Sequence, residues 1–164
     1  MPVATSLQDL MPLDDFRKLS GLEFMQTMLD GTSPGPPIGA TLGYRLYRVD
    51  DGAVEFRGTP GFGTTNPLGT VHGGWYGTLL DSAMACAVMT KVPRGSTYTT
   101  LEYKINILRA IPLETEIKCI GQINHVGRST GVAQGEIRGV GNDKLYATGS
   151  TTCIVMKLPE QEQP

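Results

Sequence analysis

The sequence predicts an α+β domain, with strands gathered mostly in one antiparallel sheet around a single apolar helix. The helix is expected from Gly73 to about Met89, because this segment is rich in Leu, Ala and Met and its length favours a buried helix. Strands are expected on both sides of it, where alternating or β-branched apolar residues are broken by turn signals. The pattern contains no internal repeat and no second domain.

The first residues predict one helix and a loop. Apolar residues at helical spacing follow Asp14-Asp15 and stop at Gly31, which is a suitable C-terminal cap. Residues 32–39 are rich in Pro and Gly and are expected to form a loop. We expect this methionine-rich helix to pack on the main body; the alternative is that it lines a ligand entrance.

The other elements follow from turns and alternation. A Gly/Pro/Thr-rich loop is expected over 58–71, and the long helix ends before Pro93. Asp51-Gly52 is a hairpin signal, and Gly127-Arg128 and Gly141-Asn142-Asp143 mark later breaks. The expected strands cover residues 42–49, 54–56, 99–107, 114–126, 132–137 and 145–156.

Composition narrows the class of protein. The 164 residues, 40% of them hydrophobic and 18% charged, are typical of one ordinary globular domain. The net charge of −2 argues against general nucleic-acid binding. No apolar run reaches transmembrane length, and the N-terminus lacks the basic region of a secretory signal. Cys86, Cys119 and Cys153 are too widely spaced for a metal pattern and are interpreted as reduced thiols of a cytoplasmic protein.

One loop and the helix after it carry the chemistry. The segment Asn66-Pro-Leu-Gly-Thr-Val-His-Gly-Gly-Trp75 brings a Gly-rich loop into a helix start, where unpaired N–H groups suit a developing negative charge. Nine residues after His72, Asp81 interrupts the apolar helix, and an unpaired buried carboxylate is costly. An oxyanion-binding turn with an acid near it outlines a hydrolytic site.

These residues resemble a known family. Asn66-x-x-Gly69-x-x-His72-Gly73-Gly74, Asp81 and residues 100–109 (TLEYKINILR) are similar to the hot-dog-fold acyl-CoA thioesterases, and most of all to their PaaI-like group. The resemblance runs from about residue 40 to 156. It implies a strongly curved sheet wrapped around one long helix, and a homodimer or homotetramer with its active site at the dimer interface. It divides the chain into an N-terminal helical extension and loop (1–39), a hot-dog domain (40–157) and a polar tail (158–164).

The resemblance implies catalytic roles for five residues. Asp81 acts as a nucleophile on the thioester carbonyl or as a base for water, and the alternative is a structural helix carboxylate. Gly73 offers its backbone N–H to the thioester oxygen, and a Gly allows the closest approach. Asn66 orients the carbonyl or the water, unless it only caps its loop. His72 has a positioning role as readily as a chemical one. Thr100 lies near the reacting group, or Thr99 does if the register shifts by one residue. Alternatively, Thr100 is only a β-branched residue of the strand.

A second set is implied in binding CoA. Arg suits bidentate phosphate contacts, and the Gly-Arg-Ser segment fits the PaaI-like pattern. The candidates are Arg109, Gly127, Arg128 and Ser129, with Lys91 and Arg94 as weaker ones. For any single one of these charges, a solvated surface position is the favoured interpretation, and only the set indicates a local patch. Trp75 and Tyr76 either shape an acyl pocket or pack in the core or an interface, and packing is favoured.

The sequence therefore predicts a thioesterase that hydrolyses acyl-CoA or aryl-CoA to free acid and CoA. No metal or cofactor is implied, since CoA is part of the substrate. Nucleic acid and membrane are not expected as partners. The main alternative is a non-catalytic acyl-CoA binding or sensing protein on the same fold. A hot-dog dehydratase fits less well, because its His and carboxylate are spaced differently from Asn66 and Asp81.

Overall fold

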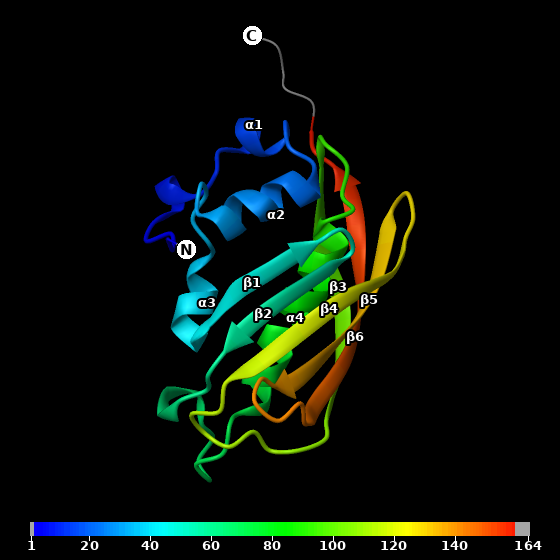
Figure 1. The fold of residues 1–164 in the computed structure, drawn as a ribbon. Coiled ribbons are helices and arrows are strands. Elements are labelled where there is room, and N and C mark those ends of the chain that lie inside the picture. Colours follow the sequence, from blue (N-terminus) through cyan, green and yellow to red (C-terminus); the bar gives the residue numbers. More distant parts are fainter. Residues whose placement is uncertain (1, 160–164) are drawn as a thin grey trace.

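The computed structural model describes residues 2–159 and contains six strands and four α-helices within them (Figure 1). The strands form one antiparallel sheet in the order β1-β2-β4-β5-β6-β3, so that β1 and β3 are its edges. The strands are β1 Tyr44–Asp50, β2 Ala53–Gly58, β3 Ser96–Ile107, β4 Ile117–Val126, β5 Thr130–Gly139 and β6 Leu145–Lys157. The helices are α1 Leu13–Phe16, α2 Gly21–Asp30, α3 Pro37–Leu42 and α4 Gly73–Met89.

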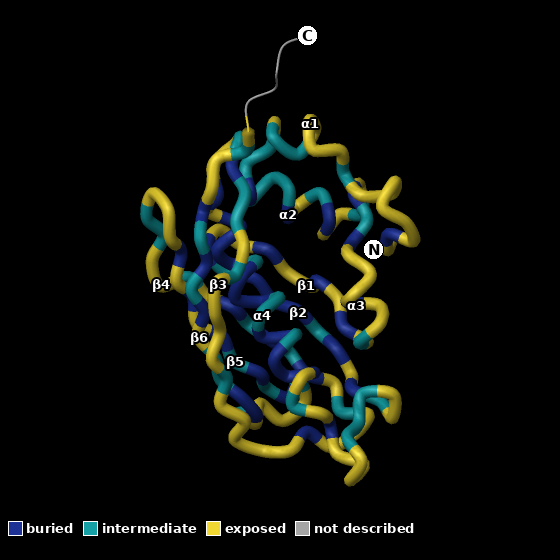
Figure 2. Tube along the Cα trace, turned by 180° about the vertical axis from the view of Figure 1, so that it is seen from behind, coloured by how far each residue is buried: buried dark blue, intermediate teal, exposed yellow. Residues whose placement is uncertain are grey.

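The sheet curves around α4, which forms the centre of the core (Figure 1). Most α4 residues are buried, and Figure 2 shows the helix mainly in the colours of buried and intermediate residues. The close approach of β4 to the helix requires Gly121, because a Cβ there would collide with the Ala83 carbonyl oxygen. The predicted α+β hot-dog architecture is confirmed.

The N-terminal region differs from the prediction in two places. The single helix expected after Asp14-Asp15 is two helices, because Ser20 starts a new one: its hydroxyl accepts from the Glu23 N–H, and the Glu23 carboxylate accepts from the Ser20 N–H. Gly31 ends α2 with φ of 85°, as predicted. The loop expected over 32–39 was wrong at its end, because Pro37 begins α3.

The remaining elements lie close to their expected positions. Gly52 has φ of 87° in the β1–β2 hairpin, and α4 has the expected bounds. β3 begins earlier than expected, at Ser96, and β5 begins at Thr130. The helix α2 places Met25 and Met28 in the same hydrophobic core as α4. The tail expected over 158–164 lies outside the described residues from 160 onward. No helix within residues 2–159 is long and apolar enough to cross a membrane.

Candidate active site

Asn66 organises the loop that precedes α4. Its Oδ1 accepts from the N–H groups of Leu68 at 2.9 Å and Thr70 at 3.2 Å, and its Nδ2 donates to Thr70 Oγ1 at 2.8 Å. Gly69 makes the turn between them, with φ of 74°. Within one chain, the Asn66 side chain therefore holds its own loop in shape, which is the capping role expected as the alternative to a catalytic one.

His72 is the N-cap of α4. Its Nδ1 accepts from the Gly74 N–H at 2.9 Å, and its backbone N–H donates to the Thr64 carbonyl at 2.9 Å. In this contact the Nδ1 atom is the acceptor and the backbone N–H is the donor. The ring therefore joins the loop to the helix start, and this geometry favours the positioning role.

Gly73 is the first residue of α4, and its N–H has no hydrogen-bond partner within residues 2–159. The positive end of the helix dipole lies at the same place, so the N–H is free to bind a developing oxyanion. A Cβ on Gly73 would meet only Ile107 Cδ1, at 3.5 Å, which is an ordinary contact. Packing inside this chain therefore does not require a glycine here, and a group arriving from outside the chain would explain it.

Asp81 lies further along α4, half-buried, and its Oδ1 accepts a 2.9 Å hydrogen bond from Thr100 Oγ1 on β3. Burial raises the pKa of the Asp81 carboxyl, and the hydrogen bond from Thr100 partly opposes this. Thr99 is exposed and makes no such contact. Of the two threonines left open by the sequence, Thr100 is the one that meets the carboxylate.

The two halves of the expected site do not meet within one chain. Gly73 and Asp81 are eight residues apart on one straight helix, which corresponds to about 12 Å along the axis. A single thioester carbonyl needs contacts of about 3 Å to both groups. One chain therefore carries two half-sites: Gly73 with the Asn66 loop near Ile107, and Asp81 with Thr100.

The predicted CoA-binding residues also separate into two places. Arg109 comes just after Ile107, the last residue of β3, which pairs with Ala147 near the start of β6. Ser129 lies near the opposite end of β6, where its carbonyl accepts a hydrogen bond from the Val155 N–H. On β6, Ala147 and the row that pairs with Thr130 are seven residues apart, roughly 23 Å. Arg109 and Arg128 therefore do not form one phosphate-binding group within a chain.

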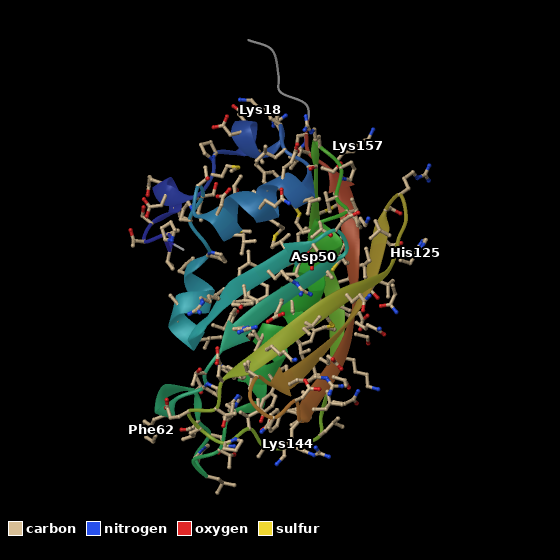
Figure 3. The ribbon with its side chains drawn as sticks, in the orientation of Figure 1. Lys18, Asp50, Phe62, His125, Lys144 and Lys157 are labelled. Carbon is tan, nitrogen blue, oxygen red and sulfur yellow. The ribbon has the colours of Figure 1, made fainter. Side chains whose placement is uncertain are left out.

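Arg128 instead lines a basic cavity of about 490 Å³ at the β4–β5 hairpin. Lys91 and Lys157 also line it, together with Gly127, so three cations share one hollow. Lys91 is paired with Asp51 at 2.6 Å, and Arg94 is paired with Glu23 outside this cavity. Lys157 was not expected from the sequence; it is the last residue of β6. Figure 3 shows it in the same upper part of the molecule as His125 of the hairpin.

Trp75 and Tyr76 pack in the core, as favoured. Trp75 Nε1 donates to the Leu42 carbonyl at 2.8 Å, and the Tyr76 hydroxyl accepts from the Ile111 N–H at 2.8 Å. Both residues are buried, with 3% and 2% of their surface exposed. They anchor loops to the first turn of α4, where Gly73 lies.

The comparisons with known proteins agree with this fold. The family model of the thioesterase superfamily matches residues 68–145. A conserved protein from Pseudomonas aeruginosa is 30% identical, with a TM-score of 0.67 over 73% of this chain and 93% of that one. A phenylacetic acid degradation-related protein from Ralstonia eutropha is 29% identical, with a TM-score of 0.72 over 80% and 98%. A thioesterase protein from Streptococcus pneumoniae, solved with coenzyme A, is 26% identical, with a TM-score of 0.65 over 75% and 93%.

None of the curated sequences compared with the chain matches it. The family model covers both Gly73 and Asp81, and the similar structures extend over nearly all of their own length. The chain belongs to the thioesterase superfamily and has the hot-dog fold. It is therefore a thioester hydrolase by class.

Proposed function

We propose that this protein hydrolyses acyl-CoA or aryl-CoA thioesters to the free acid and CoA, at sites that two copies of the chain form together. The half-buried Asp81 carboxylate, held by Thr100 at 2.9 Å, is the observation that carries the proposal. The Gly73 N–H at the start of α4, which has no hydrogen-bond partner in the described part of the chain, supplies the complementary group. The coenzyme A bound to the similar Streptococcus pneumoniae protein supports CoA as the thiol carrier.

The geometry supports a simple acyl transfer to water. The Gly73 N–H and the helix dipole stabilise the negative charge that develops on the carbonyl oxygen. Asp81 either removes a proton from the attacking water or attacks the carbonyl carbon itself and forms an anhydride that water then hydrolyses. In both routes the carbon–sulfur bond breaks, water supplies the new acid oxygen, and its proton ends on the CoA sulfur. CoA is part of the substrate, and neither route requires a metal or cofactor.

Edge strand β3 is the surface through which we propose that two copies pair. It is 12 residues long and exposes Leu101 (59%), Tyr103 (46%) and Ile107 (46%). The other edge, β1, is seven residues long and exposes Arg45 and Arg48 beside one aromatic residue, Tyr47. Antiparallel pairing of two β3 strands places the Thr100 half of each beside the Ile107 half of its partner. Asp81 of one copy thereby approaches Gly73 of the other. A dimer, or a dimer of dimers, follows.

We place this activity in the cytoplasm. Cys86, Cys119 and Cys153 are all free, which suits a reducing compartment. Burial also raises the pKa of the Cys86 thiol to about 12, so this thiol is inert at neutral pH.

The second candidate function is acyl-CoA binding without hydrolysis. The basic cavity at Arg128 would serve a binding protein as well as an enzyme. The half-buried carboxylate at Asp81 favours the enzyme. Burying a carboxylate costs free energy, and it would repel an anionic ligand that is only bound, whereas a catalytic acid or base needs such a group.

A thiol-release assay on a panel of CoA thioesters separates the two functions. The enzyme releases CoA from at least one thioester, and Asp81→Ala abolishes that release. Tight binding of CoA thioesters without thiol release by the wild-type protein would support the sensing function. Equal release by the wild-type and Asp81→Ala proteins would remove Asp81 from the mechanism.

A further inference from the structure

The face of α4 that the sheet leaves open carries the functional groups. The α4 residues after Gly73 that are not fully buried recur every three to four positions and form one stripe: Gly74, Thr78, Asp81, Ser82 and Cys86. Asp81 contacts edge strand β3 through Thr100, and Ser82 contacts edge strand β1 through a 3.0 Å hydrogen bond to the Tyr44 hydroxyl. The stripe therefore runs between the two edges of the curved sheet.

The N-terminal extension covers the upper end of this stripe and leaves a cavity beneath it. The cavity has a volume of about 210 Å³ and lies between residues of the extension, strands β1 and β2, and α4. Apolar side chains dominate its walls, including Met28, Ile38, Leu46 and Phe56. Figure 1 shows α2 and α3 beside β1 on this side of the molecule.

The α4 wall of this cavity begins at the residue that follows Asp81. This wall consists of Ser82, the next residue after Asp81, and Cys86, which is about 7.5 Å beyond Asp81 along the helix axis. Asp81 is also close enough to Tyr44 and Cys86 to contribute to raising the pKa of both groups. A thioester whose carbonyl lies at Asp81 therefore has an apolar recess within reach of its acyl side.

We infer that this cavity beneath the N-terminal extension receives the acyl part of the thioester and selects a compact apolar group, such as one aromatic ring on a short linker. This inference rests on the proposed function. A cavity of about 150 Å³ lined by apolar side chains is large enough to hold benzene, so about 210 Å³ accepts a ring with one or two further carbons. A long fatty acyl chain does not fit in this space.

A second apolar cavity of about 340 Å³ continues behind the first, under α1 and α2. Met28, Pro36 and Cys86 line both cavities, so these side chains form the partition between them. Met28 is the flexible member of the partition and belongs to the extension itself. The extension thereby sets the depth of the acyl site.

The test compares kcat/KM for phenylacetyl-CoA and acetyl-CoA in matched variants of α3. Ala40 is exposed and lines the first cavity, whereas its neighbour Thr41 is exposed and does not. Ala40→Phe projects a ring into the cavity and lowers the phenylacetyl-to-acetyl ratio by about tenfold or more. Thr41→Phe keeps the ratio within about twofold of wild type.

Met28→Ala provides an independent variant on the other wall. It opens the partition, so kcat/KM for decanoyl-CoA rises by about tenfold relative to phenylacetyl-CoA. An unchanged substrate ratio in both Ala40→Phe and Met28→Ala, with wild-type folding by circular dichroism, would overturn the acyl-site assignment while leaving the hydrolase intact. Absence of thiol release from every CoA thioester by the wild-type protein would instead overturn the proposed function.

Discussion

Thr100 Oγ1 donates a 2.9 Å hydrogen bond to Oδ1 of Asp81, and this contact ties the central helix to an edge strand of the sheet. Two opposing effects therefore act on one carboxyl. Burial raises the pKa of Asp81, and the hydrogen bond, which favours the ionised form, lowers it. Because the two effects on the pKa oppose each other, Asp81 can be partly desolvated and still serve as a base or nucleophile.

Thr100→Val should move the acid limb of the pH–rate profile to higher pH. The substitution removes the donor that lowers the pKa of Asp81, so a higher pH is needed to ionise the carboxylate. The measurement is kcat/KM against pH for a hydrolysed thioester. Thr99→Val is the matched control, because Thr99 is exposed and does not touch Asp81. An acid limb that stays in place in Thr100→Val would refute the coupling.

Asp81→Asn should lower kcat by about 10²–10⁴-fold and raise Tm at neutral pH. The folded-state pKa of Asp81 is raised, so the folded protein holds this proton more tightly than the unfolded chain does. That contribution to stability is present at low pH and is lost as the pH rises through the raised pKa. At neutral pH the ionised carboxylate is destabilising, and Asn removes it.

Thermal melts at neutral and acidic pH test this sign. The gain in Tm from Asp81→Asn should shrink as the pH falls, because wild-type Asp81 then becomes protonated. A lower Tm for the variant at neutral pH would show that the ionised carboxylate is net stabilising.

Gly73→Pro should remove the oxyanion donor without breaking the helix. Proline is favoured at the first position of a helix, and His72 before it has φ of −65° and ψ of 139°, which a following proline accepts. The expected loss in kcat is about 10²–10³-fold, with Tm near that of wild type. Gly73→Ala keeps the N–H and serves as the comparison. Equal activity in Gly73→Pro and wild type would show that this N–H does not contact the substrate.

His72 is expected to act through its cap. His72→Asn retains an N-cap acceptor and should keep most of the activity, whereas His72→Ala leaves the Gly74 N–H without its partner. The loss of a cap lowers the free energy of unfolding by about 0.5–2 kcal/mol. Denaturant unfolding and kcat of the two variants are the measurements. Loss of activity in His72→Asn as complete as in Asp81→Asn would instead assign His72 a chemical role.

The sequence predicts helix boundaries best, because capping and helix-breaking residues close to each boundary determine them. Helix α4 begins after a capping loop and ends before Pro93, so its bounds are readable from neighbouring residues. The break before α2 also had a local signal, because Ser20 and Glu23 have the spacing of a capping box.

The arrangement of the candidate site depends on contacts between distant segments. The contact of Thr100 rather than Thr99 with Asp81 depends on strand register, and β3 has an irregularity between Thr100 and Glu102. Arg109 and Arg128 look like one set along the chain, yet they lie at opposite ends of β6. Lys157 reaches the Arg128 cavity only through the fold.

The central claim is that Asp81 of one copy and Gly73 of another form each active site, and mixing two inactive variants tests it directly. Asp81→Asn and Gly73→Pro chains are refolded or co-expressed together, and their thiol release is measured. In a mixed dimer, the intact Asp81 of one chain faces the intact Gly73 of the other, so one of its two sites is restored. Random mixing then recovers about one quarter of wild-type activity. Activity of the mixture no higher than that of either variant alone, with mixed dimers shown to form, would contradict a shared site.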